Sequence, residues 1–175
     1  MERNSLIDQI LFEYKETLGR DFCKYQNHVY RVYSLCLILD GTPQNEEKYA
    51  IASAFHDLGI WTSNTFDYLD PSIALAKDWL ARQAKSELIP EISTMINMHH
   101  KISNYTGQFI KSCENFRKAD WVDVSYGIIK FDLNSKQLQT LTKKFPTIGF
   151  HRFLIKITVK NLFKNPFNPL PMFKK

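Results

Sequence analysis

The stretch DFCKYQNHVYRVYSLCLILDG, residues 21–41, decides the fold class. Its apolar side chains recur three and four residues apart, at Phe22, Tyr25, Val29, Val32, Cys36 and Leu39. This period is typical of an amphipathic α-helix that buries one face. Asp21 is a suitable N-cap residue, and Gly41 is a suitable residue to end the helix. The stretch therefore predicts a long helix from Asp21 to about Leu39, packed against other elements.

The rest of the chain repeats this helical pattern. We expect further helices over residues 5–18, 46–57, 70–83, 90–100, 109–126, 135–145 and 149–163, most of them bounded by glycine, proline or a capping residue. Residues 61–69 resemble a loop, and only residues 127–133 carry a weak strand signal. Because alternating strands and helices are missing, the sequence predicts an all-α fold, a compact single-domain helical bundle over residues 1–175.

The final segment, residues 165–175, differs from the rest of the chain. Pro166, Pro169 and Pro171 exclude a helix interior there, because proline lacks the N–H group that a helix needs. Four other residues of the segment are apolar, namely Phe167, Leu170, Met172 and Phe173. We therefore expect an extended, proline-rich tail that packs on the helical body.

Composition narrows the class of protein. Of the 175 residues, 44% are hydrophobic and 23% are charged, which is typical of one globular domain and not of a disordered chain. No apolar run approaches the ~18 residues of a membrane span, and the polar start of the chain lacks a signal-peptide core. Cys23, Cys36 and Cys113 form an odd, scattered set, which indicates reduced thiols. We therefore expect a cytoplasmic protein with no membrane partner.

The net charge of +5 favours an anionic ligand. The basic residues form no dense stripe along the sequence, and the lysine pairs at 143–144 and 174–175 are short. We therefore expect a small anionic partner and no nucleic-acid polymer. The sequence leaves the oligomeric state open.

Histidine and aspartate residues form the pattern that carries chemistry. Four of the five histidines fall on or at the end of predicted helices, and His56 is followed directly by an aspartate. The residues in question are His28, His56, Asp57, His99, His100 and Asp120. Single ligands on different helices are typical of a metal site in a helical bundle.

The order His, His-Asp, Asp, with a helical context for each, resembles the HD-domain superfamily of metal-dependent phosphohydrolases. The strings that carry the resemblance are NHVYR at 27–31, AFHDLG at 54–59 and RKADW at 117–121. Within the superfamily, the chain looks like the small single-domain proteins that end in a proline-rich segment. The resemblance implies that a divalent ion (Mn, Fe, Co, Ni or Zn) is bound by His28, His56, Asp57 and Asp120.

A bound ion of this kind supplies hydroxide at neutral pH, so that the enzyme needs no side-chain nucleophile. The His99–His100 pair resembles the pair in members that bind two metals, in which Asp57 would bridge the ions. Those members normally carry a further histidine between the His-Asp motif and the pair, and this chain has none. Asp70 falls at about that place, and its carboxylate is a candidate substitute. Asp70-Pro71 is also a typical N-cap followed by proline, which we favour, and both one ion and two ions remain open.

Three residues are candidates for binding the substrate. Arg31 lies three residues after His28 on the same helical face, where its guanidinium suits a phosphate beside the metal and a catalytic role. Lys101 follows the histidine pair and suits the same anion. Trp61, just past the His-Asp turn, is placed to wall a pocket and stack a base. Asp123, one turn from Asp120, is a candidate for orienting a metal ligand.

These features predict a metal-dependent phosphohydrolase that cleaves a phosphomonoester or phosphodiester, with a nucleotide-like small anion as substrate. Residues 58–61, LGIW, lack the acidic residues that follow the motif in the alarmone hydrolases and in the 5′-deoxynucleotidase group, which argues against both. Two alternatives remain. One is a diiron HD-type oxygenase, and the other is a non-catalytic module that binds metal or a nucleotide.

Overall fold

A computed structural model describes residues 2–168 and 170–173 of the chain, and helices supply all the regular secondary structure in these residues. The prediction of an all-α single domain is confirmed. Residues 127–133 form turns and bends in place of the weakly predicted strand. None of the helices in the described residues is long and apolar enough to cross a membrane.

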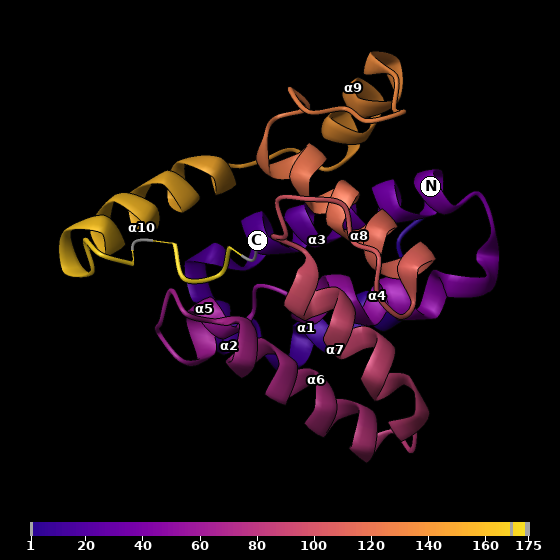
Figure 1. The fold of residues 1–175 in the computed structure, drawn as a ribbon, viewed down its shortest axis with the longest axis horizontal. Coiled ribbons are helices and arrows are strands. Elements are labelled where there is room, and N and C mark those ends of the chain that lie inside the picture. Colours follow the sequence, from indigo (N-terminus) through magenta and orange to yellow (C-terminus); the bar gives the residue numbers. More distant parts are fainter. Residues whose placement is uncertain (1, 169, 174–175) are drawn as a thin grey trace.

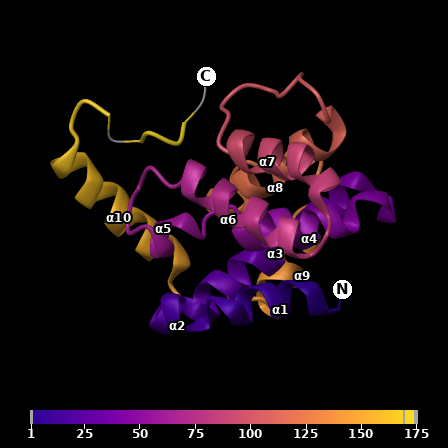
Figure 2. The same ribbon diagram turned by 90° about the horizontal axis from the view of Figure 1, so that it is seen from below.

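The helices follow one another in the order α1 (Ser5–Glu13), α2 (Lys15–Leu18), α3 (Phe22–Asp40), α4 (Glu46–Phe55), α5 (Gly59–Thr62), α6 (Leu69–Arg82), α7 (Ile89–Met98), α8 (Ile110–Val124), α9 (Ser135–Lys144) and α10 (Phe150–Lys164). Short 3-10 turns lie at Gly19–Asp21, Pro43–Asn45 and Ser86–Leu88. Figure 1 shows α9 and α10 at the periphery, outside the packed group of α1, α3, α4, α6, α7 and α8, and Figure 2 shows the peripheral place of α10 from a second side.

Helix α3 lies at the centre of the bundle, where it packs against α8 and α4. Four residues of the predicted stripe are fully buried, namely Tyr25, Val29, Val32 and Cys36. Gly41 ends the helix in the left-handed conformation, as the sequence predicts. Burial of one large apolar side chain stabilises a fold by about 1.5–3 kcal/mol, so this stripe fixes which face of α3 points inward.

The structure departs from the predicted helices at Tyr14 and at Gly59. The helix expected over residues 5–18 breaks at Tyr14 into α1 and α2. The stretch expected to be a loop from Trp61 onward begins with the short helix α5, which starts at Gly59. A Cβ atom on Gly59 would lie 2.5 Å from the backbone oxygen of Tyr68, so glycine here permits the close approach of α6 to α5.

The predicted N-cap at Asp70 is wrong. Helix α6 starts one residue earlier, at Leu69, with Tyr68 in the capping position. Asp70 lies inside the first turn, and its side chain is exposed. A carboxylate there still complements the partial positive charge at the start of the helix, which accounts for an aspartate at this position without a cap.

The chain after α10 turns back toward the bundle (Figure 1). Met172 is 3% exposed and packs with Ile60, Tyr68 and Leu69. Phe173 stacks on the ring of His100, with the ring centroids 5.3 Å apart. The expected packing of the tail therefore holds at these two residues.

The other apolar tail residues do not pack in this way. Phe167 is fully exposed, and Leu170 is 37% exposed. Pro169 lies outside the described residues. Among the described apolar residues of the tail, Met172 and Phe173 therefore pack on the bundle, and Phe167 and Leu170 do not.

Candidate metal centre

Six side chains from four parts of the fold converge in the interior of the bundle. Helix α3 carries His28, the junction of α4 and α5 carries His56 and Asp57, the end of α7 is followed by His99 and His100, and α8 carries Asp120. Three of the four histidines and Asp120 are 0% exposed, and Asp57 is 3% exposed. The side chain of His100 is 12% exposed. The structure thus brings together every predicted ligand except Asp70.

The end of α4 explains how two neighbouring residues reach one place. Consecutive side chains on a helix point about 100° apart. Helix α4 ends at Phe55, and the backbone turns through residues 56–58 before α5 begins. His56 and Asp57 therefore both face the interior, with His56 Nε2 and Asp57 Oδ2 3.5 Å apart.

Hydrogen bonds fix the rings of three histidines. The Nδ1–H group of His28 donates to Asp123 Oδ2 at 2.7 Å, that of His56 to the Ser53 carbonyl at 2.8 Å, and that of His99 to the Ile96 carbonyl at 2.6 Å. A carbonyl oxygen only accepts, so Nδ1 must carry the proton in His56 and His99. In all three rings Nε2 is the nitrogen left to face the interior, as in metal-binding histidines whose second nitrogen is anchored.

The first group of candidate ligands surrounds His28 and His56. Their Nε2 atoms lie 2.9 Å apart, and each lies 3.5 Å from Asp57 Oδ2. Asp120 Oδ1 lies 3.7 Å from the His28 nitrogen and 3.6 Å from the His56 nitrogen. Two nitrogens that bind one ion at ~2.1 Å, at a right angle, lie about 3 Å apart. The geometry of this group therefore fits a divalent ion.

The second group lies on the other side of Asp57. Asp57 Oδ1 is 3.5 Å from His99 Nε2, and the ligand atoms of Asp57, His99 and His100 all lie within 4.8 Å of one another. His100 Nδ1 is 3.6 Å from Asp120 Oδ2. Asp57 thus presents one carboxylate oxygen to each group, the arrangement that a ligand shared by two ions requires.

Several polar atoms of the centre are buried without a hydrogen bond in the described part of the chain. They are Asp57 Oδ1, His99 Nε2 and both carboxylate oxygens of Asp120. An unpaired buried carboxylate is costly, because burial removes the water that would otherwise solvate its charge. These atoms are all acceptors, so a cation and not another acceptor is what the cluster lacks.

The electrostatics keep the carboxylates ionised. Burial alone would raise the pKa of Asp57, but His56, together with His28 and His99, holds this pKa well below its usual range. Burial likewise opposes ionisation of Asp120, and the contact with His56 still lowers its pKa. Burial and neighbouring His99 lower the pKa of His100 to about 3, so the ring is neutral at pH 7. Ionised carboxylates and a neutral imidazole are the states that bind a metal.

Arg31 does not occupy the predicted place beside a phosphate. Arg31 is 1% exposed. Its guanidinium forms a bidentate ion pair with Asp123, with Nε–Oδ1 at 2.5 Å and Nη2–Oδ2 at 2.9 Å. Its Nη1 donates to the carbonyl of Phe145 at 3.0 Å. Asp123 in turn holds His28. Arg31 therefore positions the candidate ligand His28 through Asp123, and its guanidinium is occupied by Asp123 and the Phe145 carbonyl.

The Arg31–Asp123 pair also acts on the charge of the centre. Burial alone would lower the pKa of His28, but its hydrogen bond with Asp123 and its contact with Asp57 raise this pKa to about 9. His151 is buried and hydrogen-bonds the backbone oxygen of Asp123 at 2.7 Å. These contacts form a layer behind His28 that orients its ring.

The other two predicted substrate residues, Lys101 and Trp61, have other partners. The carbonyl of Lys101 accepts hydrogen bonds from Arg117 and Trp121, each at 3.2 Å. Trp61 stacks on Phe153 of α10, with centroids 5.1 Å apart, and donates from Nε1 to Asp21 at 3.1 Å. Trp61 lines a groove that none of the candidate metal ligands lines, so this groove is not the predicted substrate pocket, and the ring of Trp61 stacks on Phe153.

Asp70 is exposed and lies outside the converging set, so the structure gives it no part in a second metal site. Sequence reasoning missed Tyr68, which is 2% exposed and whose hydroxyl lies 2.6 Å from His100 Nε2. A tyrosine before a helix has no local signal that separates this contact from ordinary core packing.

The fold and the site define the protein as a helical bundle with a buried histidine–aspartate cluster suited to divalent metal. Comparisons of the chain with protein-family models, curated proteins and solved structures find no match. The functional argument therefore depends on the residues of this chain.

Proposed function

We propose that the protein is a metal-dependent phosphohydrolase of the HD-domain type that acts on a small phosphate-containing anion. The observation that carries the proposal is the set of buried acceptor atoms without hydrogen bonds at Asp57, His99 and Asp120. When bound there, a divalent transition metal ion supplies hydroxide at neutral pH and polarises a phosphoryl oxygen.

Each residue has a defined part in this proposal. His28, His56, Asp57 and Asp120 would hold one ion, and Asp57, His99 and His100 a second. The nitrogen and oxygen donors suit Mn, Fe, Co, Ni or Zn. Arg31 and Asp123 orient His28, while the carbonyls of Ser53 and Ile96 orient His56 and His99.

Substrate would approach the centre on the side of His100. This residue has the most exposed side chain of the six, at 12%, while the others are almost completely covered. Tyr68 and Phe173 both contact the His100 ring. The end of the tail therefore lies over the only partly open side of the described cluster.

A diiron oxygenase is the second candidate, because Asp57 presents one oxygen to each of two ligand groups. The absence of a histidine between Asp57 and His99 counts against it. A non-catalytic binding module is the third candidate.

The test uses protein stripped of metal by a chelator and reloaded separately with Mn, Fe(II), Co, Ni or Zn. We expect at least one loaded form to hydrolyse p-nitrophenyl phosphate or bis(p-nitrophenyl) phosphate more than about 100-fold faster than the stripped protein, since metal-bound hydroxide replaces neutral water. Oxygen consumption by the iron form without hydrolysis in any form would favour the oxygenase. Metal uptake with neither reaction would contradict the enzyme proposal and favour the binding module.

A further inference from the structure

A groove lined with basic side chains runs between α10 and the segment that contains α5. One part is a cavity of about 530 Å³ whose lining includes Trp61, Phe153 and the cations Arg20, Lys24, Arg152, Lys156 and Lys160. An adjoining cavity of about 240 Å³ shares Ile60, Asn64, Ile157 and Lys160 with the first and adds Lys164. The shared lining makes the two cavities one groove, and none of the candidate metal ligands lines it.

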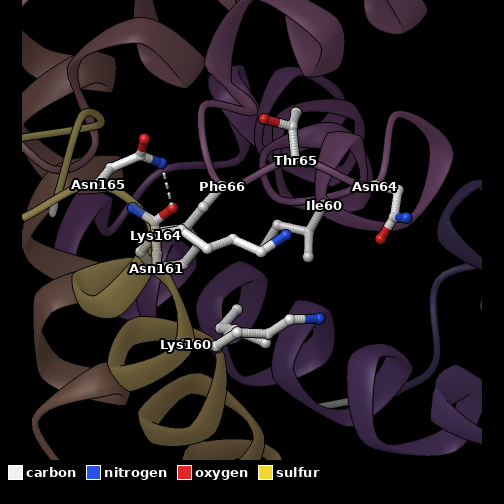
Figure 3. Close-up of a pocket in the computed structure, with 9 residues that line it drawn as sticks. Ile60, Asn64, Thr65, Phe66, Lys160, Asn161, Lys164 and Asn165 are labelled. Carbon is white, nitrogen blue, oxygen red and sulfur yellow. Dashed lines mark hydrogen bonds between the residues drawn. The ribbon is translucent and has the colours of Figure 1, made fainter. Parts of the chain in front are cut away.

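Figure 3 shows the second part of the groove. Lys160 and Lys164 extend their ammonium groups from α10 across the cavity, toward the segment that carries Ile60 and Asn64. The side chains of Asn64 and Thr65 on that segment supply neutral hydrogen-bonding groups. The groove therefore offers cations on one wall and polar groups on the other.

The charge of the molecule is concentrated in this groove. Its lining contains six cationic side chains and one carboxylate, Asp21, which pairs with Lys24 at 2.7 Å. The net positive charge of the groove is thus as large as the +5 of the whole chain. The net charge of the remaining residues is close to zero, so the groove accounts for the net attraction of the protein for an anion in solution.

Five of these cations have no ion pair with any carboxylate of the described residues, namely Arg20, Arg152, Lys156, Lys160 and Lys164. The last four recur every fourth residue along α10, which contains no aspartate or glutamate. Like charges at this spacing lie on the same face and repel each other. A bound polyanion would reduce the repulsion between the cations of this unpaired row.

We propose that this groove binds a multiply charged phosphate chain, such as an inorganic polyphosphate or the phosphates of a nucleoside polyphosphate. Successive cations stand about 6 Å apart along the helix axis, so an extended chain of phosphates meets one cation per turn. The site is concave. A concave site suits a soluble ligand that can enter it, whereas a flat membrane surface could not reach into it. It goes beyond the proposed metal chemistry, since binding here needs no metal.

Isothermal titration calorimetry of the metal-stripped full chain with inorganic triphosphate tests the proposal. The groove variant combines Lys156→Ala and Lys160→Ala. The matched control combines Lys77→Ala and Lys143→Ala, which removes the same charge from exposed positions that do not line the groove. We expect binding at least about tenfold weaker in the groove variant, less than about twofold weaker in the control, and weaker for all forms as salt rises, because ions screen the attraction.

Three outcomes would overturn the proposal. Equal weakening in both variants would show attraction to net charge alone, and no measurable binding by the wild type would show that the groove has no affinity for a phosphate chain. Binding to phosphatidylserine vesicles that depends on Lys156 and Lys160, without binding of triphosphate, would assign the cations to a lipid surface. All four lysines are exposed, and circular dichroism confirms that the variants remain helical.

Discussion

Replacement of Asp57 by asparagine is expected to remove bound metal and to reduce phosphoester hydrolysis by more than about 100-fold, beyond the 10- to 100-fold typical when only a residue that orients a ligand is lost. Asp57 occurs in both three-residue groups of candidate metal ligands. Asparagine has about the size of aspartate but no negative charge. Its NH₂ group can also point toward the imidazole nitrogens that would bind the metal. Elemental analysis and initial rates on the reloaded protein measure the two effects.

Asp70→Asn is the matched control for this change. It removes the same charge from an exposed carboxylate on α6, outside the cluster. We expect its metal content and rate to stay within about twofold of wild type, in keeping with the small effects of surface substitutions. Full activity and full metal content in Asp57→Asn would contradict the assignment of Asp57 as the shared ligand.

Replacement of Arg31 by methionine is expected to lower the free energy of unfolding by about 3–5 kcal/mol, the usual cost of leaving a buried charge without its partner. The variant strands Asp123, whose pKa is held low against burial by the charge of Arg31 and by the contact with His28. Urea unfolding of the stripped protein, followed by circular dichroism, measures the loss.

A second variant separates the ion pair from simple packing. Adding Asp123→Asn to Arg31→Met removes the stranded charge, so part of the lost stability should return, as expected for residues in contact. Metal affinity should fall about 10- to 100-fold in the double variant, since His28 there loses Asp123 as its charged anchor. A loss of stability below about 1 kcal/mol in Arg31→Met would contradict the buried ion pair.

The fold class could be predicted because helical periodicity is a local property. The apolar spacing within residues 21–41 identifies the buried face of α3 without any knowledge of its partners. The break at Tyr14 and the short helix α5 could not be predicted in this way. They depend on contacts between distant segments, such as the approach of Tyr68 to Gly59.

The candidate ligands could be predicted in part for the same reason. His28, His56, Asp57 and Asp120 share an order and local contexts that can be read from the chain. The role of Arg31 could not be read, because its partner Asp123 lies 92 residues away and only the folded structure shows which carboxylate it meets. The sequence does not distinguish a cationic residue that binds substrate from one that orients a metal ligand.

The basic groove was hidden from the sequence by a similar cause. No dense basic run exists along the chain, because Arg20 and Lys24 are remote in sequence from the cations of α10. Folding places these two sets on one groove. The sequence shows cations four residues apart along α10 and no carboxylate in that helix. It does not show that this row shares a groove with Arg20 and Lys24.

The metal content of untagged protein, measured by elemental analysis after reconstitution and with anomalous diffraction to locate the ions, tests the central claim most directly. We expect at least one equivalent of a transition metal between His28, His56, Asp57 and Asp120, with any second ion beside His99 and His100, and loss of metal in Asp57→Asn. A helical, folded wild-type protein that holds no metal after reconstitution would contradict it.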